Sequence, residues 1–431
     1  MKALMSTLDN GLKVIIVDTK AFPSLTTLLL VGAGSRYENE INNGIAHFFE
    51  HMAFKGSKKY PTSMILSSTI ESFGGVFNAF TGKDHTGYWI KAPARHFDTV
   101  LDVIADMIQR PLLLPEEIER EKGVIIEEIN LYEDTPYRKV GEIYERLIYG
   151  THPLGFDIAG TKKTVSAFNR STFTDYIKNL YHPKNAVLIV AGGISTNGNH
   201  KDPQYYLDQI KNQFSGWKNG VKSEYSKISL TQDKPQILIK NKKTEQAHFC
   251  LGFQAYSRVD DRKYPLTVLS ALLGGGMSSR LFYEVRERRG LCYYISTSRD
   301  LYSDVGSLVT QAGVPIKIDK VKEAIEVTLK EHNKIVKGEV SKEELLKAKE
   351  LIKGRLILSM EDSATVANWY GKDLLLEGEI KEMQTVMDKI DRVNTSDIVS
   401  IASDIFREQG LNLAVIGPFE DKKAFEEILH I

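Results

Sequence analysis

The sequence predicts a mixed fold of strands and helices whose plan occurs twice along the chain. At 431 residues the chain is too long for one ordinary hydrophobic core, so we expect at least two domains. Apolar residues make up 42% of it and charged residues 26%, the balance of a folded globular protein. The second half repeats the order of elements of the first more than it repeats the residues. Together these observations favour two related halves.

Composition argues against several classes of partner. Lys plus Arg and Asp plus Glu each number 56, so no net charge attracts nucleic acid or an anionic membrane. Residue 1 leads directly towards a strand, so we expect no signal peptide. The apolar run over residues 28–31 is too short to span a bilayer. Cys250 and Cys292 are too few for a disulfide framework and suit a reducing compartment. We therefore expect a cytoplasmic protein.

The first half alternates strands with amphipathic helices. An Asn-Gly turn and runs of β-branched residues indicate strands, whereas apolar residues at three- and four-residue spacing indicate helices. We expect strands over residues 12–17, 24–31, 76–81, 86–92 and 186–192. We expect helices over residues 45–54, 63–73, 94–109, 115–132, 171–181 and 204–214. Asn42, Asn43 and Gly44 offer cap residues for the first of these helices.

The helix over residues 45–54 carries the residues of greatest chemical interest. His47 and His51 are four apart, so they are neighbours on one face of a helix, with Glu50 beside them. The opposite face is apolar and anchors the helix. Two imidazoles and a carboxylate are what a metal hydrolase needs to begin a site. The alternative is that these polar residues are only the solvated face of an amphipathic helix.

The helix that starts at Pro115 offers a third ligand. Glu121 and Glu128 are seven apart and lie on the flank of its apolar stripe, whereas Glu127 projects from nearly the opposite side. Glu128 would complete a set of two histidines and one glutamate, and a catalytic zinc usually has three protein ligands. The alternative, which composition alone favours, is a glutamate-rich solvated face.

The hairpin over residues 76–92 offers an edge on which a peptide can bind. An unpaired edge strand is a template for an extended peptide, which it holds by main-chain hydrogen bonds. Most edge strands bind nothing, so this interpretation depends on the metal motif nearby.

The second half keeps the scaffold without the metal motif. Residues 266–273, which take the place of the first-half metal helix, contain no ligand side chain. The polar stretch over residues 215–234 is typical of an interdomain linker. We therefore expect a catalytic domain over residues 1–214, a linker over 215–234 and a related domain without zinc ligands over 235–431.

Nearly the whole chain resembles the pitrilysin/insulinase family of zinc metallopeptidases, in particular its short processing-peptidase-like branch. Residues 47–56 match the inverted zinc motif of that family, and residues 121–129 match the segment with its third ligand. The resemblance implies one Zn²⁺ per chain, held by the three residues His47, His51 and Glu128. It also implies Glu50 as general base and Glu121 as an outer partner of the ligands.

The resemblance assigns residues that bind substrate as well. Residues 74–79 resemble the strand that pairs with the peptide, so Asn78 and Ala79 are expected to contact its backbone. Residues 274–281 and 286–293 resemble the segment that offers an arginine and a tyrosine to the substrate carbonyl, here Arg286 and Tyr293.

The resemblance further implies the fold and the activity. It implies an α+β chain of two related domains, each an antiparallel sheet with helices on one side, as in the mitochondrial processing peptidase, arranged as a clamshell. We expect an endopeptidase that hydrolyses unfolded or presequence-like peptides in an enclosed chamber, working as a homodimer without nucleic acid or membrane. The alternative is a non-catalytic peptide-binding or assembly subunit on the same scaffold. A purely structural metal module would need four protein ligands.

Overall fold

The computed structural model describes residues 2–195, 201–220 and 224–430. None of the helices in these ranges combines the length and the apolar character that a membrane span needs. The chain forms two compact units. Unit 1 consists of Met1–Ile129, Asp157–Ser226 and Leu358–Lys381. Unit 2 consists of Asn130–Phe156, Lys227–Ile357 and Glu382–Ile431.

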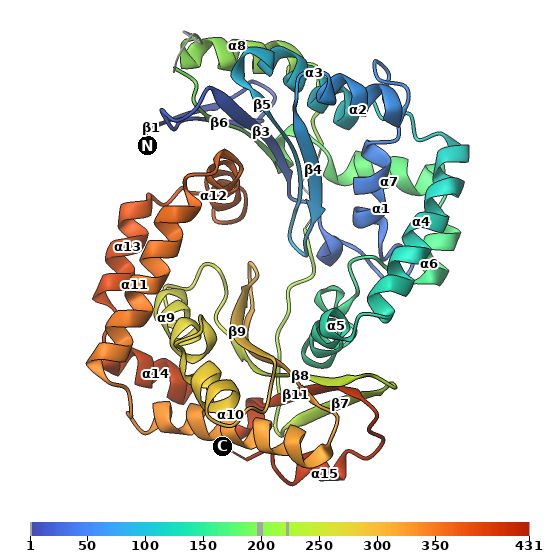
Figure 1. Cartoon of the computed structure of the whole chain (residues 1–431). Coiled ribbons are helices and arrows are strands. Elements are labelled where there is room, and N and C mark those ends of the chain that lie inside the picture. The colour runs from blue at the N-terminus through green and yellow to red at the C-terminus, as the bar shows by residue number, and fades with distance from the viewer. Residues whose placement is uncertain (1, 196–200, 221–223, 431) are drawn as a thin grey trace. The chain divides into compact units, whose positions relative to one another are not determined.

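Unit 1 is built on a six-stranded sheet of order β1-β2-β6-β3-β5-β4 (Figure 1). Neighbouring strands are antiparallel except β2 and β6, which are parallel. The strands are β1 (Lys2–Thr7), β2 (Lys13–Asp18), β3 (Ser24–Val31), β4 (Val76–Thr81), β5 (Thr86–Pro93) and β6 (Ala186–Gly192). β3, in the interior of the sheet, is buried over seven of its eight residues, and β4 forms one edge.

Helices cover one face of this sheet and enclose the main core of unit 1. They are α1 (Ile45–Ala53), α2 (Ser63–Glu71), α3 (Phe97–Gln109), α4 (Pro115–Glu133), α6 (Lys162–Ala167), α7 (Arg170–Leu180) and α8 (Pro203–Phe214). The predicted apolar face of α1 is confirmed, because Ile45, Phe48, Phe49 and Met52 are all at most 1% exposed. This burial fixes which face of α1 is left for His47 and His51.

Unit 2 repeats the plan with five strands in the order β7-β11-β8-β10-β9. It too has one parallel pair, β7 and β11, and is otherwise antiparallel. Without β1, the sheet of unit 1 has the same pattern, so the predicted pair of related α+β domains is confirmed. The strands are β7 (Gln236–Asn241), β8 (Gln246–Ala255), β9 (Tyr294–Leu301), β10 (Gly306–Pro315) and β11 (Asn412–Gly417). The helices are α9 (Lys263–Gly274), α10 (Ile318–Val336), α11 (Lys342–Ser359), α13 (Met383–Arg392), α14 (Thr395–Ile405) and α15 (Lys423–Glu426).

Each sheet also carries a helix on its second face, which the expectation of helices on one side did not include. In unit 1, α12 (Ser363–Leu376) buries Val366 and Ala367 in a cluster with Ile189 of β6. Gly371 permits the close approach, since a Cβ there would lie 2.5 Å from Ile189 Cδ1. In unit 2, α5 (Pro136–Tyr149) covers β8 and β11 in the same way.

These two helices change the domain boundaries. α5 belongs to unit 2 although it precedes the linker, and α12 belongs to unit 1 although it follows it. The units are therefore not contiguous in sequence, in contrast to the expected division at residues 215–234. The physical reason is that both sheets have two apolar faces to bury, and helical periodicity does not say which sheet a helix will cover.

Candidate metal centre

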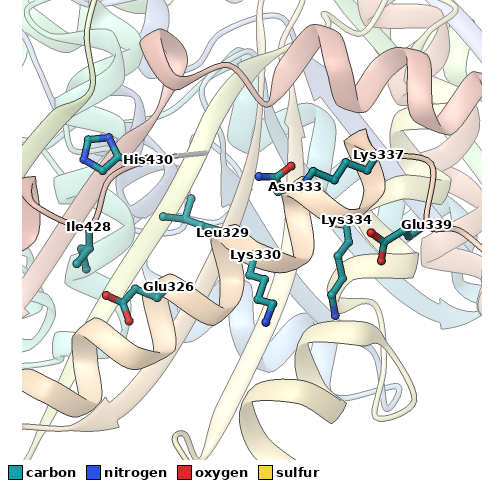
Figure 2. Close-up of a pocket in the computed structure, with 9 residues that line it drawn as sticks. All are labelled: Glu326, Leu329, Lys330, Asn333, Lys334, Lys337, Glu339, Ile428 and His430. Atoms are coloured by element: carbon teal, nitrogen blue, oxygen red, sulfur yellow. The ribbon is translucent and has the colours of Figure 1, made fainter.

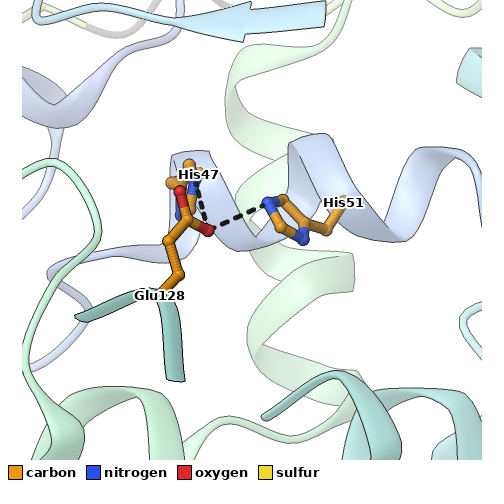
Figure 3. A group of neighbouring side chains, drawn as sticks. All are labelled: His47, His51 and Glu128. Carbon is orange, nitrogen blue, oxygen red and sulfur yellow. Dashed lines mark ion pairs between the residues drawn. The ribbon is translucent and has the colours of Figure 1, made fainter. Parts of the chain in front are cut away.

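His47, His51 and Glu128 meet at one point in unit 1 (Figure 3). The Nε2 atoms of His47 and His51 each lie 3.6 Å from Glu128 Oε2. Tetrahedral zinc with bonds of about 2.0–2.2 Å would space its ligand atoms about 3.3–3.6 Å apart. Two imidazole nitrogens and a carboxylate oxygen are also the donor set of catalytic zinc sites. The three side chains therefore fit a zinc ion, and within the described residues they are the one such group of three.

Helix α1 supplies two of these side chains and α4 the third. The spacing of four residues brings the His47 and His51 rings together, with centroids 4.7 Å apart. Glu128 reaches the two histidines from α4. The buried residues Ile118, Glu121 and Ile125 fix which face of α4 lies against the core. His47 is buried, and the other two are half-buried, as a site open to substrate requires.

Glu121 contacts His51 on the side away from Glu128. Its Oε1 lies 2.8 Å from His51 Nδ1, and its Oε2 lies 2.5 Å from the Nζ atom of Lys55. Burial opposes the charge of Glu121, but hydrogen bonds from His51 and Lys55 outweigh it and hold its pKa below the usual value. A charged Glu121 accepts the Nδ1 proton, so the Nε2 lone pair of His51 stays available to a metal.

Glu50 lies on α1 next to His51 and receives a hydrogen bond from outside its helix. Thr81 Oγ1, at the end of β4, donates to Glu50 Oε2 over 2.5 Å. The sequence places Thr81 at the end of a strand but gives no signal that it reaches Glu50.

The start of α1 is held by Glu38, another residue that the sequence did not single out. Its buried carboxylate accepts hydrogen bonds from the backbone N–H groups of Gly44 (2.8 Å) and Ala46 (2.9 Å) and from Asn43 Nδ2 (2.9 Å). Burial raises the pKa of Glu38 to about 7, although these donors oppose the rise. Gly44 is the N-cap and makes no side-chain cap, so Glu38 satisfies the helix end in its place.

The expected substrate residues lie where the sequence placed them on their elements. Asn78 is exposed and Ala79 half-buried on β4, whose one partner in the sheet is β5. In unit 2, Arg286 lies against the ring of Tyr293 at 5.7 Å, and Tyr293 is 75% exposed. Their roles stay predictions. Helix α9, the counterpart of α1, presents buried apolar residues as expected.

Unit 2 also has a cavity of about 350 Å³ along α10 (Figure 2). Lys330, Lys334 and Lys337 line it together with Glu326, Glu339 and His430. No three side chains in this lining gather around a point in the way that His47, His51 and Glu128 do. The cavity is therefore no second candidate for the metal.

An α+β chain with two histidines and a glutamate at one point and a further carboxylate beside them has the features of a metallohydrolase. Comparison with known families identifies it more closely. Residues 13–162 match the model of insulinase (peptidase family M16), and residues 167–352 match that of the peptidase M16 inactive domain. The chain belongs to the insulinase family of peptidases, M16. The ligand-free second half fits the second of these models.

Comparison with individual proteins agrees with this family assignment. The chain is 33% identical over 413 residues to the uncharacterized zinc protease YmxG of Bacillus subtilis, covering 96% of this chain and 97% of that protein. It is 30% identical to the uncharacterized zinc protease SCO5738 of Streptomyces coelicolor, covering 97% and 90% respectively. A protease from Helicobacter pylori has the same fold, with a TM-score of 0.88 at 24% identity over 97% of this chain and 99% of that one.

Proposed function

We propose that this protein is a zinc-dependent endopeptidase that cleaves unfolded oligopeptides or presequence-like peptides. The observation that carries the proposal is the meeting of His47 Nε2 and His51 Nε2 with Glu128 Oε2 at 3.6 Å. These three side chains would hold one zinc ion per chain. A bound zinc supplies a Lewis acid that polarises the peptide carbonyl and makes water a nucleophile near neutral pH.

Glu50 would act as the general base and then as the acid. Its carboxylate takes a proton from the attacking water and passes that proton to the nitrogen of the departing amine. The backbone that carries Glu50 is held in place by packing, since the opposite face of α1 is fully buried.

The peptide would bind as an added strand on β4. Main-chain hydrogen bonds to Asn78 and Ala79 would hold it, and such bonds require an extended, unfolded substrate rather than a particular sequence. Arg286 and Tyr293 would donate to the carbonyl oxygen as it becomes negative. Removing one such donor typically costs about 10²–10³ in rate. We also propose that the protein is a homodimer, which sedimentation analysis would test.

Metal analysis combined with digestion of a mixed peptide library tests the function. We expect one zinc per chain and cleavage at internal peptide bonds, and both should be lost in His51→Ala. Glu50→Gln should keep the zinc and lose turnover, and Tyr293→Phe should lower turnover with zinc unchanged. A wild-type protein that binds peptides and never cleaves them would instead support the non-catalytic alternative. Full turnover by Glu50→Gln would refute the assigned base.

A further inference from the structure

The carboxylate of Glu50 is held from the strand on which the peptide is expected to bind. Thr81, the last residue of β4, donates its hydroxyl hydrogen to Glu50 Oε2 over 2.5 Å. We propose that Thr81 is a positioning residue that fixes the orientation of the Glu50 carboxylate and so couples peptide cleavage to the geometry of β4. This inference rests on the proposed function, because it assigns a role within peptide hydrolysis.

A glutamate carboxylate needs such a partner because its last torsion is soft. Rotation about that bond has broad, roughly two-fold minima, so packing of the stem does not aim the two oxygens. Thr81 provides the one hydrogen bond to the Glu50 carboxylate within the residues that the structure describes. With Oε2 occupied by the hydroxyl, Oε1 is left to accept the proton of the attacking water. A hydrogen bond from a hydroxyl to a charged acceptor is also stronger than one between two neutral groups.

The hydroxyl itself sits in a rigid place, because the loop after Thr81 is bound to a buried segment, residues 34–38. Ser35 N and Arg36 N donate to the carbonyl oxygens of Gly82 (3.1 Å) and Lys83 (3.0 Å). The Arg36 guanidinium also pairs with Asp84 at 2.7 Å, and both residues are at most 5% exposed. A buried charged pair with this geometry holds its loop firmly as long as both partners are present.

The same segment anchors the helix that carries Glu50. Glu38 binds the first turn of α1 through two backbone N–H groups. Gly34 lets the segment approach the loop closely, since a Cβ there would lie 2.3 Å from Lys83 O. The segment over residues 34–38 therefore contacts both the loop that follows the donor Thr81 and the helix that carries the acceptor Glu50.

Strand β4 links the binding of the peptide to the orientation of the Glu50 carboxylate. Asn78 and Ala79 precede Thr81 by three and two residues on one strand, which rises about 3.3 Å per residue. A peptide paired with them is therefore held by the same strand whose end directs the base. Because one strand carries both, the paired peptide and the Thr81 hydroxyl keep a fixed position relative to each other.

The test compares Thr81→Val, which removes the hydroxyl at nearly constant shape, with Thr81→Ser, which keeps it. Using a fluorogenic peptide that the wild type cleaves, we expect Thr81→Val to lower kcat about 10- to 100-fold, the effect of a misplaced catalytic group. KM and zinc content should change by less than about three-fold, because neither depends on the hydroxyl. Thr81→Ser should recover kcat to within about three-fold of the wild type. Thr174→Val is the matched control, because the exposed Thr174 hydroxyl bonds Ser171 O in its own helix and no other partner among the residues that the structure describes.

A second measurement needs no activity. In the Glu50→Gln background, adding Thr81→Val should leave the peptide dissociation constant unchanged, which separates orientation of the base from binding of the substrate. The proposal is overturned if Thr81→Val keeps wild-type kcat, if it raises KM alone, or if Thr81→Ser loses as much kcat as Thr81→Val. Failure of the proposed function gives a different result: the wild type itself then neither binds zinc nor cleaves the peptide.

Discussion

Glu121 contacts His51 and Lys55 at the same time, with a hydrogen bond at one carboxylate oxygen and an ion pair at the other. Oε1 lies 2.8 Å from His51 Nδ1 and Oε2 lies 2.5 Å from Lys55 Nζ, and the carboxylate is almost wholly buried. Lys55 compensates the buried negative charge, and that charge in turn orients the imidazole. His47 differs, because its buried Nδ1 has no hydrogen-bond partner in the described part of the chain. The two histidines are therefore supported unequally.

This arrangement predicts the effect of Glu121→Gln. The amide keeps an oxygen for His51 but loses the charge that makes the imidazole a stronger ligand. We expect zinc affinity to fall about 10- to 100-fold, as for other outer-shell partners. Competition with a chelator measures the dissociation constant. Glu117→Gln, one turn earlier on α4 and paired with Arg120 at the surface, is the control. Equal zinc affinity in both variants would contradict the role of Glu121.

Glu38 makes a second prediction, which concerns stability. Glu38→Gln keeps one acceptor oxygen and replaces the other with an NH₂ group. Since an NH₂ group cannot accept, at least one of the N–H groups that Glu38 binds at the start of α1 loses its hydrogen bond. We expect the free energy of unfolding to fall by about 1–3 kcal/mol, the usual penalty for a buried unsatisfied group. Urea unfolding measures this loss. Glu40→Gln, at an exposed neighbouring position, should change it by less than about 0.5 kcal/mol. Similar losses in both variants would argue against a capping role.

The parts of the site that depend on local spacing are predictable from the sequence. His47, Glu50 and His51 share one helix, so periodicity was enough to place them, and the flank position of Glu128 distinguished it from Glu127. Thr81 and Glu38 could not be found in this way, because their bonds to α1 arise only when distant segments pack.

The same limit applies to the fold. The paired sheets and the apolar face of α1 follow from patterns within each element. The assignment of α5 to unit 2 and of α12 to unit 1 does not follow from such patterns. An amphipathic helix can cover either of two similar apolar sheet faces, and its own sequence does not say which one.

Removal of the metal should destabilise the protein. The ligands come from α1 and α4, so an ion bound to the folded state alone adds stability in proportion to the logarithm of its concentration over its dissociation constant. At a free zinc concentration of about 100 times that constant, the gain is about 2.7 kcal/mol. Thermal unfolding with and without a chelator measures it. His51→Ala should unfold at the same temperature in both conditions, whereas an equal chelator effect in that variant would place the stabilising ion elsewhere.

His332, on α10 in the core of unit 2, predicts a dependence of stability on acid that is independent of zinc. Its ring is 2% exposed and stacks on Phe406 with centroids 4.3 Å apart. Burial lowers the pKa of His332 from 6.5 to about 3, so on acidification the unfolded chain takes up a proton well before the folded one does. Stability is therefore lost as the pH falls through about 6.5, by about 2 kcal/mol on reaching about pH 5. In chelator-treated protein, His332→Phe should keep the stack and show a smaller loss over this range in urea unfolding. The difference between the two slopes isolates His332, because every other titrating group is common to both proteins. Identical slopes would mean that the His332 ring is not neutral in the folded core.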